Sequence, residues 1–563
     1  MKAAIQGIRR RTFLTMTGAS AAAAILAACG NSATSANTPT SGGAATTGAT
    51  APTAVPMMVA TALPAVAQTA PTTVPTAAMA MMAAMPMQAP SNGTLRIATP
   101  DKLTTLDPTG ASSVAGPTLT VSRQIWDSLV VKDPMTGDYR PSLATKWDTP
   151  DPQTWVFTLR PDVKFHDGTA VTSADVKATL DRITQQKGPV QPLWGTLDTV
   201  ETPDPLTARM KFKAPIGTVL GSAALLPVIP AAQINADGFF NKPIGSGPFK
   251  VNSFKPDDSL TLDANPTYWG GAPKLQSLVF RIIPETTARL TSLQNGEIDI
   301  TWSVPPDQLP KLKGDPNLVV TPTPSYTYYF VWFNSKRPPL TDKRVRQALL
   351  YAVDVDSIVK NLLAGIGMRA QAPIPATVFG FAPQTPYAYD PNKAKQLLMD
   401  AGYMQGPPID MHWTITGGPQ IQSIADTLVS YWNAVGVKVA SDQQEPGIWL
   451  DKNVKLDWDM QLQTNQVTTG DADFTLRRLY VSSANRNGYG NPDLDKALSD
   501  AAGIPDQKQR AMLYAQAEKI IWDDAVGLFP FDLTENFVYS KKVSGFVPVP
   551  NSIPSFASVS VAK

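Results

Sequence analysis

A single cysteine in 563 residues sets the first constraint on how this chain can fold. With one thiol no intrachain disulfide can form, so a folded domain must be stabilised by packed apolar cores and hydrogen bonds. Hydrophobic residues make up 43% of the chain, which is enough for large cores. A chain of this length normally divides into two or more domains.

The position of that cysteine, Cys29, indicates a processed N-terminus. Arg10-Arg11-Thr12-Phe13-Leu14 precedes an apolar run at 19–28 that is too short to span a membrane. The twin arginines resemble a twin-arginine export signal, although they are also compatible with general secretion. Leu26-Ala27-Ala28-Cys29 resembles a bacterial lipobox, whose cysteine is acylated. We expect 1–29 to be a lipoprotein signal peptide and the mature protein to be extracytoplasmic, anchored to the cell membrane by lipidated Cys29.

Residues 30–92 carry no charged side chain and consist mainly of Ala, Thr, Pro, Ser and Met. The prolines favour extended chain, and no apolar periodicity is present to form a core. The segment therefore predicts a disordered tether. Its seven methionines leave open a second role in binding Cu(I), because thioethers are soft ligands.

Charge and histidine content exclude two classes of function. The formal net charge is +2, and residues 1–29 hold four basic and no acidic side chains, so the rest of the chain has a net charge of −2. Nucleic-acid binders usually carry a basic excess, so no nucleic-acid partner is expected. His166 and His412 are the only histidines, too few for a typical metalloenzyme, and we predict no metal and no cofactor.

From residue 93 onward, strand and helix patterns intermix, which indicates an α/β or α+β protein. Alternating apolar residues predict strands, and capping residues or 3.6-residue periodicity predict helices. The predicted strands are 93–98 and 155–160. Two predicted helices begin at 172–173 and at 341–343, and two others cover 393–401 and 421–434.

Four ordered groups of motifs resemble the peptide/nickel-binding family of ABC-importer solute-binding lipoproteins, family 5. The first group includes Phe165-His166-Asp167-Gly168-Thr169, and the second includes Gly245-Ser246-Gly247-Pro248-Phe249. The motifs cover 141–147, 155–169 and 172–176, then 243–250, 265–271 and 273–275, then 333–334, 338–340 and 342–348, and finally 488–495.

The resemblance implies an α/β, two-lobed fold of the type II periplasmic-binding-protein kind, with an extra subdomain inserted in the first lobe. On that pattern lobe one covers 93–133, 245–325 and 527–563, the subdomain covers 134–244, and lobe two covers 326–526. The chain would cross between lobes near 326–333 and 524–531. The implied function is that of a receptor, not an enzyme, which encloses a di- or oligopeptide-like solute and delivers it to an ABC permease. We expect a monomer.

The resemblance also implies a ligand contact in Thr468-Thr469-Gly470-Asp471-Ala472-Asp473. In peptide-binding members an aspartate of the corresponding stretch holds the peptide's ammonium group, which favours Asp471, with Asp473 as the alternative. We expect the empty cleft to leave the Asp471 carboxylate in water, so that replacing it with Asn would leave folding unchanged. Val467 and Thr468 stand where peptide binders often carry a tryptophan, so a sugar, an opine-like amine or a metal chelate stays open as the solute.

Further ligand-binding candidates are aromatic or charged residues near the expected cleft. Aromatic side chains are suited to line such a cleft, a guanidinium can grip a carboxylate, and a histidine can donate a hydrogen bond. These candidates are Tyr328, Tyr329, Trp449, Arg369, Arg486 and His412.

A secreted hydrolase that uses Asp471 and Asp473 as an acid–base pair is the rival from a different class. Two carboxylates two residues apart on an extended segment would point to opposite faces, which suits paired catalysis poorly. The chain also has no Gly-x-Ser-x-Gly or His-Glu-x-x-His motif. We therefore expect no catalytic residue.

Overall fold

The computed structural model describes residues 93–134, 136–363, 367–403, 406, 408–414, 418 and 420–562. The predicted signal peptide, the lipid attachment at Cys29 and the predicted tether lie outside these residues and stay predictions. Within the described part, no helix is both long enough and apolar enough to cross a membrane.

The strands fall into one large sheet, one four-stranded sheet and two small ribbons. In chain order they are β1 (Thr94–Thr99), β2 (Val130–Lys132), β3 (Tyr139–Pro141), β4 (Ala144–Asp151), β5 (Thr154–Leu159), β6 (Leu197–Asp204), β7 (Thr207–Phe212), β8 (Phe249–Lys255), β9 (Ser259–Ala264), β10 (Ser277–Ile282), β11 (Ile300–Thr301), β12 (Leu318–Phe333), β13 (Gly367–Arg369), β14 (Ile409–Trp413), β15 (Val439–Gln443), β16 (Met460–Gln466), β17 (Gly527–Leu528), β18 (Phe531–Ser540), β19 (Val543–Ser544) and β20 (Ser560–Val561).

The helices confirm the sequence-based predictions closely. They are α1 (Gly116–Ile125), α2 (Ser173–Gln186), α3 (Val219–Ala223), α4 (Thr286–Gln294), α5 (Leu309–Lys313), α6 (Lys343–Tyr351), α7 (Val355–Asn361), α8 (Pro391–Asp400), α9 (Ile421–Ala434), α10 (Pro446–Lys455), α11 (Ala472–Tyr480), α12 (Pro492–Gly503) and α13 (Gln507–Asp523). Thr172 caps α2 and Asp342 caps α6, as expected, while α8 begins at its proline, two residues before the predicted start.

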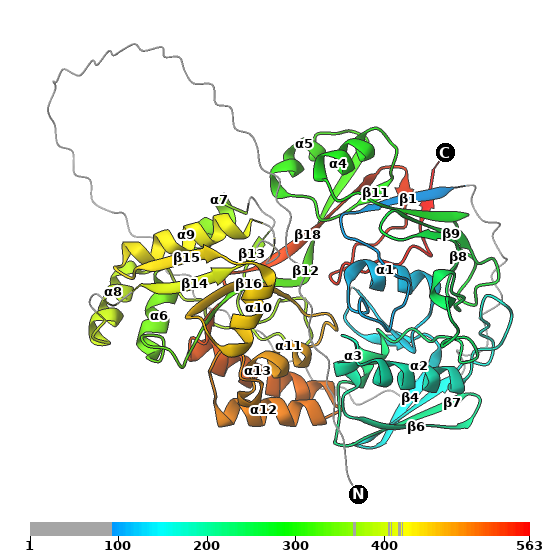
Figure 1. The fold of residues 1–563 in the computed structure, drawn as a ribbon, viewed down its shortest axis with the longest axis horizontal. Helices are drawn as coiled ribbons and strands as arrows, with labels where there is room; N and C mark the ends of the chain where they lie inside the picture. The colour runs from blue at the N-terminus through cyan, green and yellow to red at the C-terminus, as the bar shows by residue number, and fades with distance from the viewer. Residues whose placement is uncertain are drawn as a thin grey trace, which may run out of the picture. The chain divides into compact units, whose positions relative to one another are not determined.

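The large sheet is continuous because β12 and β18 pair with each other and with strands on both sides of them. The strand order is β15-β14-β16-β12-β18-β11-β1-β10-β9-β8. Leu318 to Pro324 of β12 pair with β18, and Thr327 to Phe333 pair with β16, with an irregularity in the β12–β18 register between the two stretches. In Figure 1 these long strands run side by side between the blue-to-green and the yellow-to-orange parts of the ribbon.

The smaller sheet, β4-β5-β7-β6, is antiparallel and has its own apolar core. Helix α2 contributes Val176, Leu180 and Ile183 to that core, all without exposed surface. Its N-terminus carries a capping box, because Thr172 and Asp175 satisfy each other's backbone amides. Helix α3 and the short 3₁₀ turn Gln191–Trp194 pack on the same core.

The Gly245-Ser246-Gly247 motif packs against the C-terminal end of α1. A Cβ atom on Gly245 would lie 2.0 Å from the Ile125 carbonyl oxygen, so no larger residue fits there without movement. His166 contacts the same motif through both ring nitrogens. Its Nδ1 accepts a hydrogen bond from the Gly245 amide, so the ring proton is on Nε2, which donates to the Gly247 carbonyl. Burial lowers the pKa of His166 to about 4, consistent with this neutral, structural role.

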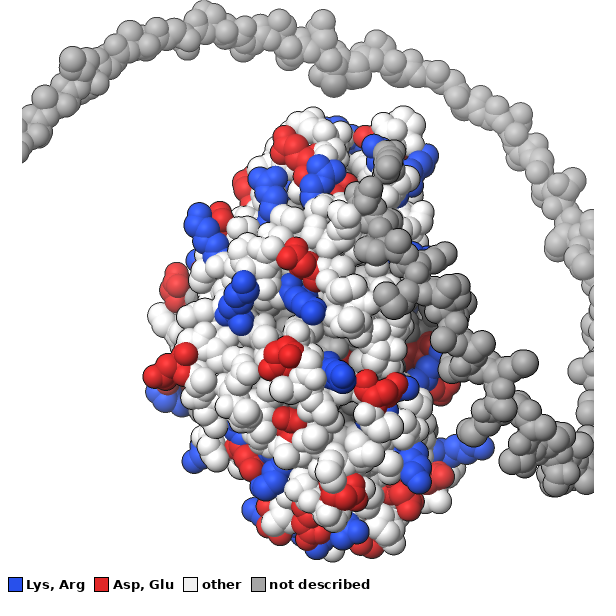
Figure 2. Space-filling model, turned by 90° about the vertical axis from the view of Figure 1, so that its right-hand side faces the viewer, with Lys and Arg blue, Asp and Glu red and all other residues white. Residues whose placement is uncertain are grey.

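Charged side chains of both signs are interspersed on the face shown in Figure 2, and no large patch of one sign appears there. This distribution agrees with the nearly balanced charge of the chain after residue 29. This face therefore carries no electrostatic footprint of the kind that nucleic-acid binding requires.

Asp532 of β18 is buried next to the irregular part of the β12–β18 ladder. The side chain is 4% exposed, Oδ1 has no hydrogen-bond partner, and Oδ2 accepts only from the Ala376 amide at 3.3 Å. Burial of the charged form raises the pKa of Asp532 to about 7. Folding therefore favours the protonated carboxyl group.

We expect Asp532→Asn to stabilise the protein at pH 8. In wild type the cost of ionising this group grows as pH rises from about 4, the ordinary pKa of an aspartate, to about 7, and the variant does not carry it. The free energy of unfolding in urea should favour the variant by about 2–4 kcal/mol at pH 8. The difference should shrink toward zero near pH 4, and a difference independent of pH would contradict this assignment.

Candidate functional site

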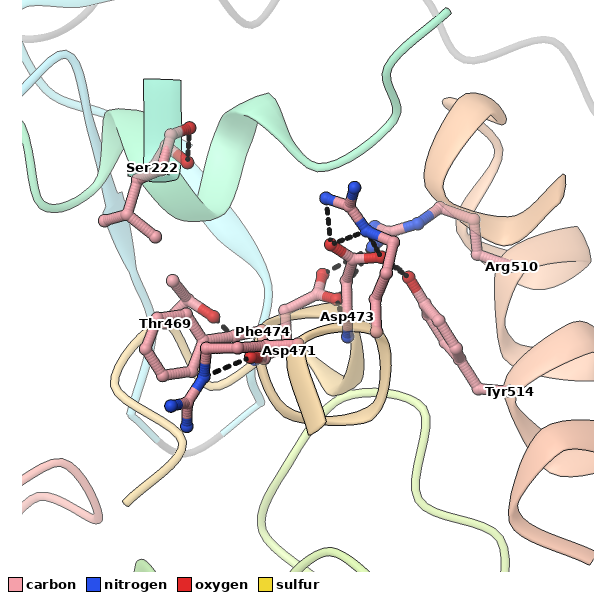
Figure 3. Close-up of polar contacts among 10 residues, drawn as sticks. Ser222, Thr469, Asp471, Asp473, Phe474, Arg510 and Tyr514 are labelled. Atoms are coloured by element: carbon pink, nitrogen blue, oxygen red, sulfur yellow. Dashed lines mark hydrogen bonds and ion pairs between the residues drawn. The ribbon is translucent and has the colours of Figure 1, made fainter. Parts of the chain in front are cut away.

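A pocket of about 510 Å³ lies between two segments that are far apart in the sequence. One wall comes from the 3₁₀ turn, the loop after β7 and α3, and includes Leu193, Thr218 and Ser222. The other wall comes from the loop before α11 and from α11 itself. It includes Thr469, Asp471, Asp473, Phe474, Arg477 and Arg478. Figure 3 shows Ser222 on one side and Thr469, Asp471 and Phe474 on the other.

Asp471 is held by a buried ion pair. Nη2 of Arg510, on α13, donates to both carboxylate oxygens at 2.7 and 2.8 Å, and the two side chains are 5% and 3% exposed. The same nitrogen contacts the Tyr514 hydroxyl at 2.9 Å. Attraction to Asp471 outweighs burial and raises the pKa of Arg510. The expectation of a solvated Asp471 is wrong, because α13 closes over this carboxylate (Figure 3).

The backbone around Asp471 explains why the side chain points inward. Asp471 is the N-cap of α11, and its Oδ1 accepts from the Asp473 amide at 3.0 Å. The preceding Gly470 has a φ of +64°, which favours glycine. A Cβ there would also lie 2.5 Å from Nζ of Lys132. The Gly470 carbonyl accepts from the Phe379 amide, so the turn is fixed from both sides.

Asp473 lies on the same side as Asp471, contrary to the prediction of an extended segment. Both residues lie in the first turn of α11 or at its cap, and both line the pocket. Arg477, one helical turn later, donates to both oxygens of Asp473 at 2.9–3.1 Å. Burial raises the pKa of Asp473. Each carboxylate therefore has its own guanidinium partner, Arg510 for Asp471 and Arg477 for Asp473.

Arg478 brings a positive charge to the pocket without a carboxylate to balance it. Its Nη2 donates to the Asn465 side-chain oxygen at 2.6 Å, its Nε donates to the Phe474 carbonyl, and its guanidinium lies over the Phe474 ring. Among the described residues no carboxylate lies within ion-pair distance of it. Arg478 is exposed at the edge of the pocket. Partial loss of water around the guanidinium is the main cause that lowers its pKa, and Arg486 adds to the effect. A ligand carboxylate would supply the missing counter-charge.

Two hydrogen bonds join chain segments on the two sides of the pocket, next to its lining residues. Nζ of Lys132, on β2, donates to the Gly470 carbonyl at 2.6 Å and lies over the Tyr326 ring. The Gly217 amide donates to the Ala502 carbonyl at 2.6 Å, and a Cβ on Gly217 would lie 1.8 Å from the Ile504 carbonyl oxygen. The chain therefore has a close approach here that only glycine permits.

Comparison with known proteins assigns this arrangement to a family. The model of the bacterial extracellular solute-binding proteins, family 5 middle region, matches residues 138–488. The glutathione-binding protein GsiB of Pectobacterium atrosepticum is 30% identical over 436 residues, which cover 74% of this chain and 84% of that protein. The chain belongs to family 5 of the bacterial extracellular solute-binding proteins.

Other relatives agree on family and fold. The probable D,D-dipeptide-binding periplasmic protein DdpA of Escherichia coli is 29% identical, covering 74% of this chain and 83% of that protein. DppA of Helicobacter pylori, solved with the peptide STSA, superposes with a TM-score of 0.70 at 25% identity, over 84% of this chain and 99% of that one. HbpA2 of Haemophilus parasuis superposes with a TM-score of 0.76 at 24% sequence identity. The superposition covers 84% of this chain and 100% of that one. These likenesses confirm the predicted two-lobed α/β fold and a receptor function in ABC import.

The remaining predicted contact residues of this solute-binding protein lie away from the pocket. Tyr328 and Tyr329 are fully buried on opposite faces of β12, in two different apolar clusters. Arg369 pairs with Asp356, and His412 pairs with Asp442.

The last two predicted residues lie outside the pocket lining as well. Trp449 is half-buried on α10, and Arg486 is exposed in the loop before α12. The roles of all six residues in solute binding stay predictions.

Sequence reasoning missed three cationic residues at the site of this solute-binding protein. Arg477 carried a usable signal, because its spacing of four from Asp473 is that of a helical ion pair. Arg478 follows Arg477 directly, and its position at the pocket depends on the helix α11, which the sequence analysis did not predict. Arg510 gave no local signal, since it contacts Asp471 across 39 residues of sequence.

Replacing Asp471 with Asn should destabilise the ligand-free protein. The change leaves the Arg510 guanidinium buried without its counter-ion, which typically costs about 3–5 kcal/mol. Asp473→Asn is the matched control: its partner Arg477 is 45% exposed and can turn to water, so a loss of about 1 kcal/mol is expected. Urea unfolding without solute measures both. Equal, small losses would mean that the Asp471–Arg510 pair does not stabilise the fold.

Proposed function

We propose that this receptor captures a small peptide-like zwitterion, with the amino-acid head group of the solute bound in the pocket between α3 and α11. The observation that carries the proposal is the charge arrangement of that pocket. Arg478 offers a guanidinium without a carboxylate partner, while Asp471 and Asp473 offer carboxylate oxygens shared with Arg510 and Arg477. The Arg478 guanidinium matches a carboxylate of the solute, and the oxygens of Asp471 and Asp473 match an ammonium group of the solute.

The names of the relatives support the same class of solute. GsiB is named for glutathione, DdpA for D,D-dipeptides, and the Helicobacter DppA structure contains a peptide. All of these ligands carry at least one ammonium group and one carboxylate. A neutral sugar would leave the charge of Arg478 unbalanced, so the pocket favours the peptide-like class over that alternative.

Binding between two walls gives the receptor its signal. A solute that contacts α3 and α11 together adds favourable contacts only when the walls are close, so it shifts the population toward the closed state. The Lys132–Gly470 and Gly217–Ala502 hydrogen bonds already join the two sides of the pocket in the structure, and we propose that they add to the stability of the closed state. We propose that an ABC permease accepts the receptor in this state, that the receptor works as a monomer without catalysis, and that Cys29 anchors it outside the cytoplasm.

Calorimetry with a fixed panel tests the solute class. The panel is glutathione, dialanine, maltose and the nickel–histidine chelate, each titrated into the purified domain 93–563. We expect binding of glutathione or dialanine, and Arg478→Gln should weaken it at least about tenfold because a charge-assisted bond is lost. Arg281→Gln, which removes a 45% exposed arginine on β10, is the control. Binding of maltose alone would contradict the proposal.

Cys29→Ser should leave an exported protein that keeps its signal peptide and carries no thioether-linked lipid. A serine cannot form the thioether to which the lipid is attached, so the variant should not incorporate labelled palmitate. The measurement is the radiolabel in the immunoprecipitated protein, with wild type in the same host as the control. Equal labelling of both proteins would contradict the lipid anchor.

The tether variant that lacks 30–92 should still be labelled, since the lipobox is intact.

A further inference from the structure

A second cavity, of about 230 Å³, lies beside α1 and shares no lining residue with the pocket already described. Its walls combine aromatic rings with polar groups. Trp126, Tyr268 and Trp269 provide the rings, and Ser122, Ser142 and Ser555 provide hydroxyl groups. Arg123, from the last turn of α1, lines the cavity as well. We call this the α1 cavity.

The Arg123 guanidinium makes no hydrogen bond and no ion pair with any described residue. Guanidinium groups carry five N–H donors, and leaving them unmatched in a partly buried position is costly. Burial accordingly lowers the pKa of Arg123, with Asp127 and Tyr268 opposing the shift. The donors therefore face a space that a ligand acceptor can fill.

Asp127, the acid that acts electrostatically on Arg123, already accepts three side-chain hydrogen bonds from other residues. Its Oδ1 accepts from the Tyr268 hydroxyl at 2.8 Å, and its Oδ2 accepts from the Ser246 hydroxyl and the Trp269 indole, both at 2.9 Å. Asp127 is 8% exposed, and burial raises its pKa. The carboxyl group of Asp127 thus connects residues of the cavity wall, and it acts on Arg123 through space without forming an ion pair with it.

A small space of about 40 Å³ lies between the α1 cavity and the pocket at α11. It shares Arg123, Ala224 and Leu225 with the α1 cavity and Thr469 with the pocket. Lys132 and Tyr326 line it between the two ends. A solute that occupied both sites would therefore have to widen this small space, with Arg478 and Asp471 at one end and Arg123 at the other, and it would pass the positive charge of Lys132.

We infer that the α1 cavity is a second anion subsite, in which Arg123 binds a carboxylate at the far end of the solute while Trp126, Tyr268 and Trp269 pack on the carbon atoms next to it. This inference rests on the proposed function for the position of the head group. It narrows the solute to elongated molecules that carry a carboxylate at each end, such as acidic or γ-linked peptides, rather than neutral dipeptide amides or sugars.

The first test compares glutathione with its glycine monoethyl ester, which removes only the far carboxylate. In wild type the ester should bind at least about tenfold more weakly than glutathione, because the ester lacks the carboxylate that pairs with Arg123. In Arg123→Gln the ester and the acid should bind equally, and Arg123→Lys should keep part of the difference. Arg281→Gln should behave as wild type. A full ester penalty that persists in Arg123→Gln overturns the inference.

The second test does not require a peptide to bind. Phenylglyoxal, which modifies accessible guanidinium groups, should label Arg123 in the ligand-free domain, and glutarate, a simple dicarboxylate, should slow that labelling. Arg281 in the same digest is the internal control. If wild type binds neither form of glutathione, the head-group assignment fails for this ligand, and glutarate protection of Arg123 still supports the anion subsite. Labelling of Arg123 that glutarate does not change overturns it.

Discussion

The pairing of β12 with β18 is the interaction on which the rest of the structure depends. Each strand takes part in the continuous sheet, and the register irregularity near Pro324 to Tyr328 is where β12 changes its partner contacts. Because the alternating side chains of β12 enter two different apolar clusters, the strand is fixed from both faces. The loop that carries Asp471 follows β16, the next strand of this ladder, so the position of the site derives directly from this backbone pairing.

Electrostatics then shape the solute site from paired and unpaired charges. Asp471 and Asp473 have guanidinium partners, whereas Arg478 and Arg123 have no carboxylate partner among the described residues. Paired carboxylates keep hydrogen-bonding capacity while their charge is balanced. Unpaired guanidinium groups at cavity walls gain most from an anionic ligand, because the ligand replaces water with a charge-assisted bond. Under the proposed function, the site combines reversible binding with a preference for acidic, zwitterionic solutes.

Local patterns predicted the elements well, and long-range contacts limited the prediction of the site. The capping residues Thr172 and Asp342 and the stop at Gly436 depend only on neighbours in sequence, and the helices formed as expected. The aromatic run at Tyr328 was interpreted as a cleft wall, but alternation alone does not tell a cleft from a second core. The prediction that the Asp471 carboxylate lies in water was wrong for a related reason. No sequence pattern near Asp471 indicates its ion pair with Arg510.

Native mass spectrometry of the gently purified domain 93–563 tests the central claim most directly, because it identifies a retained solute without a choice of candidates. The account predicts one bound molecule per chain, whose fragments show an amino group and at least two carboxylates. It also predicts that this mass is lost from Arg478→Gln and Arg123→Gln but retained in Arg281→Gln. A retained solute without ammonium or carboxylate groups, such as a neutral sugar, would contradict the account.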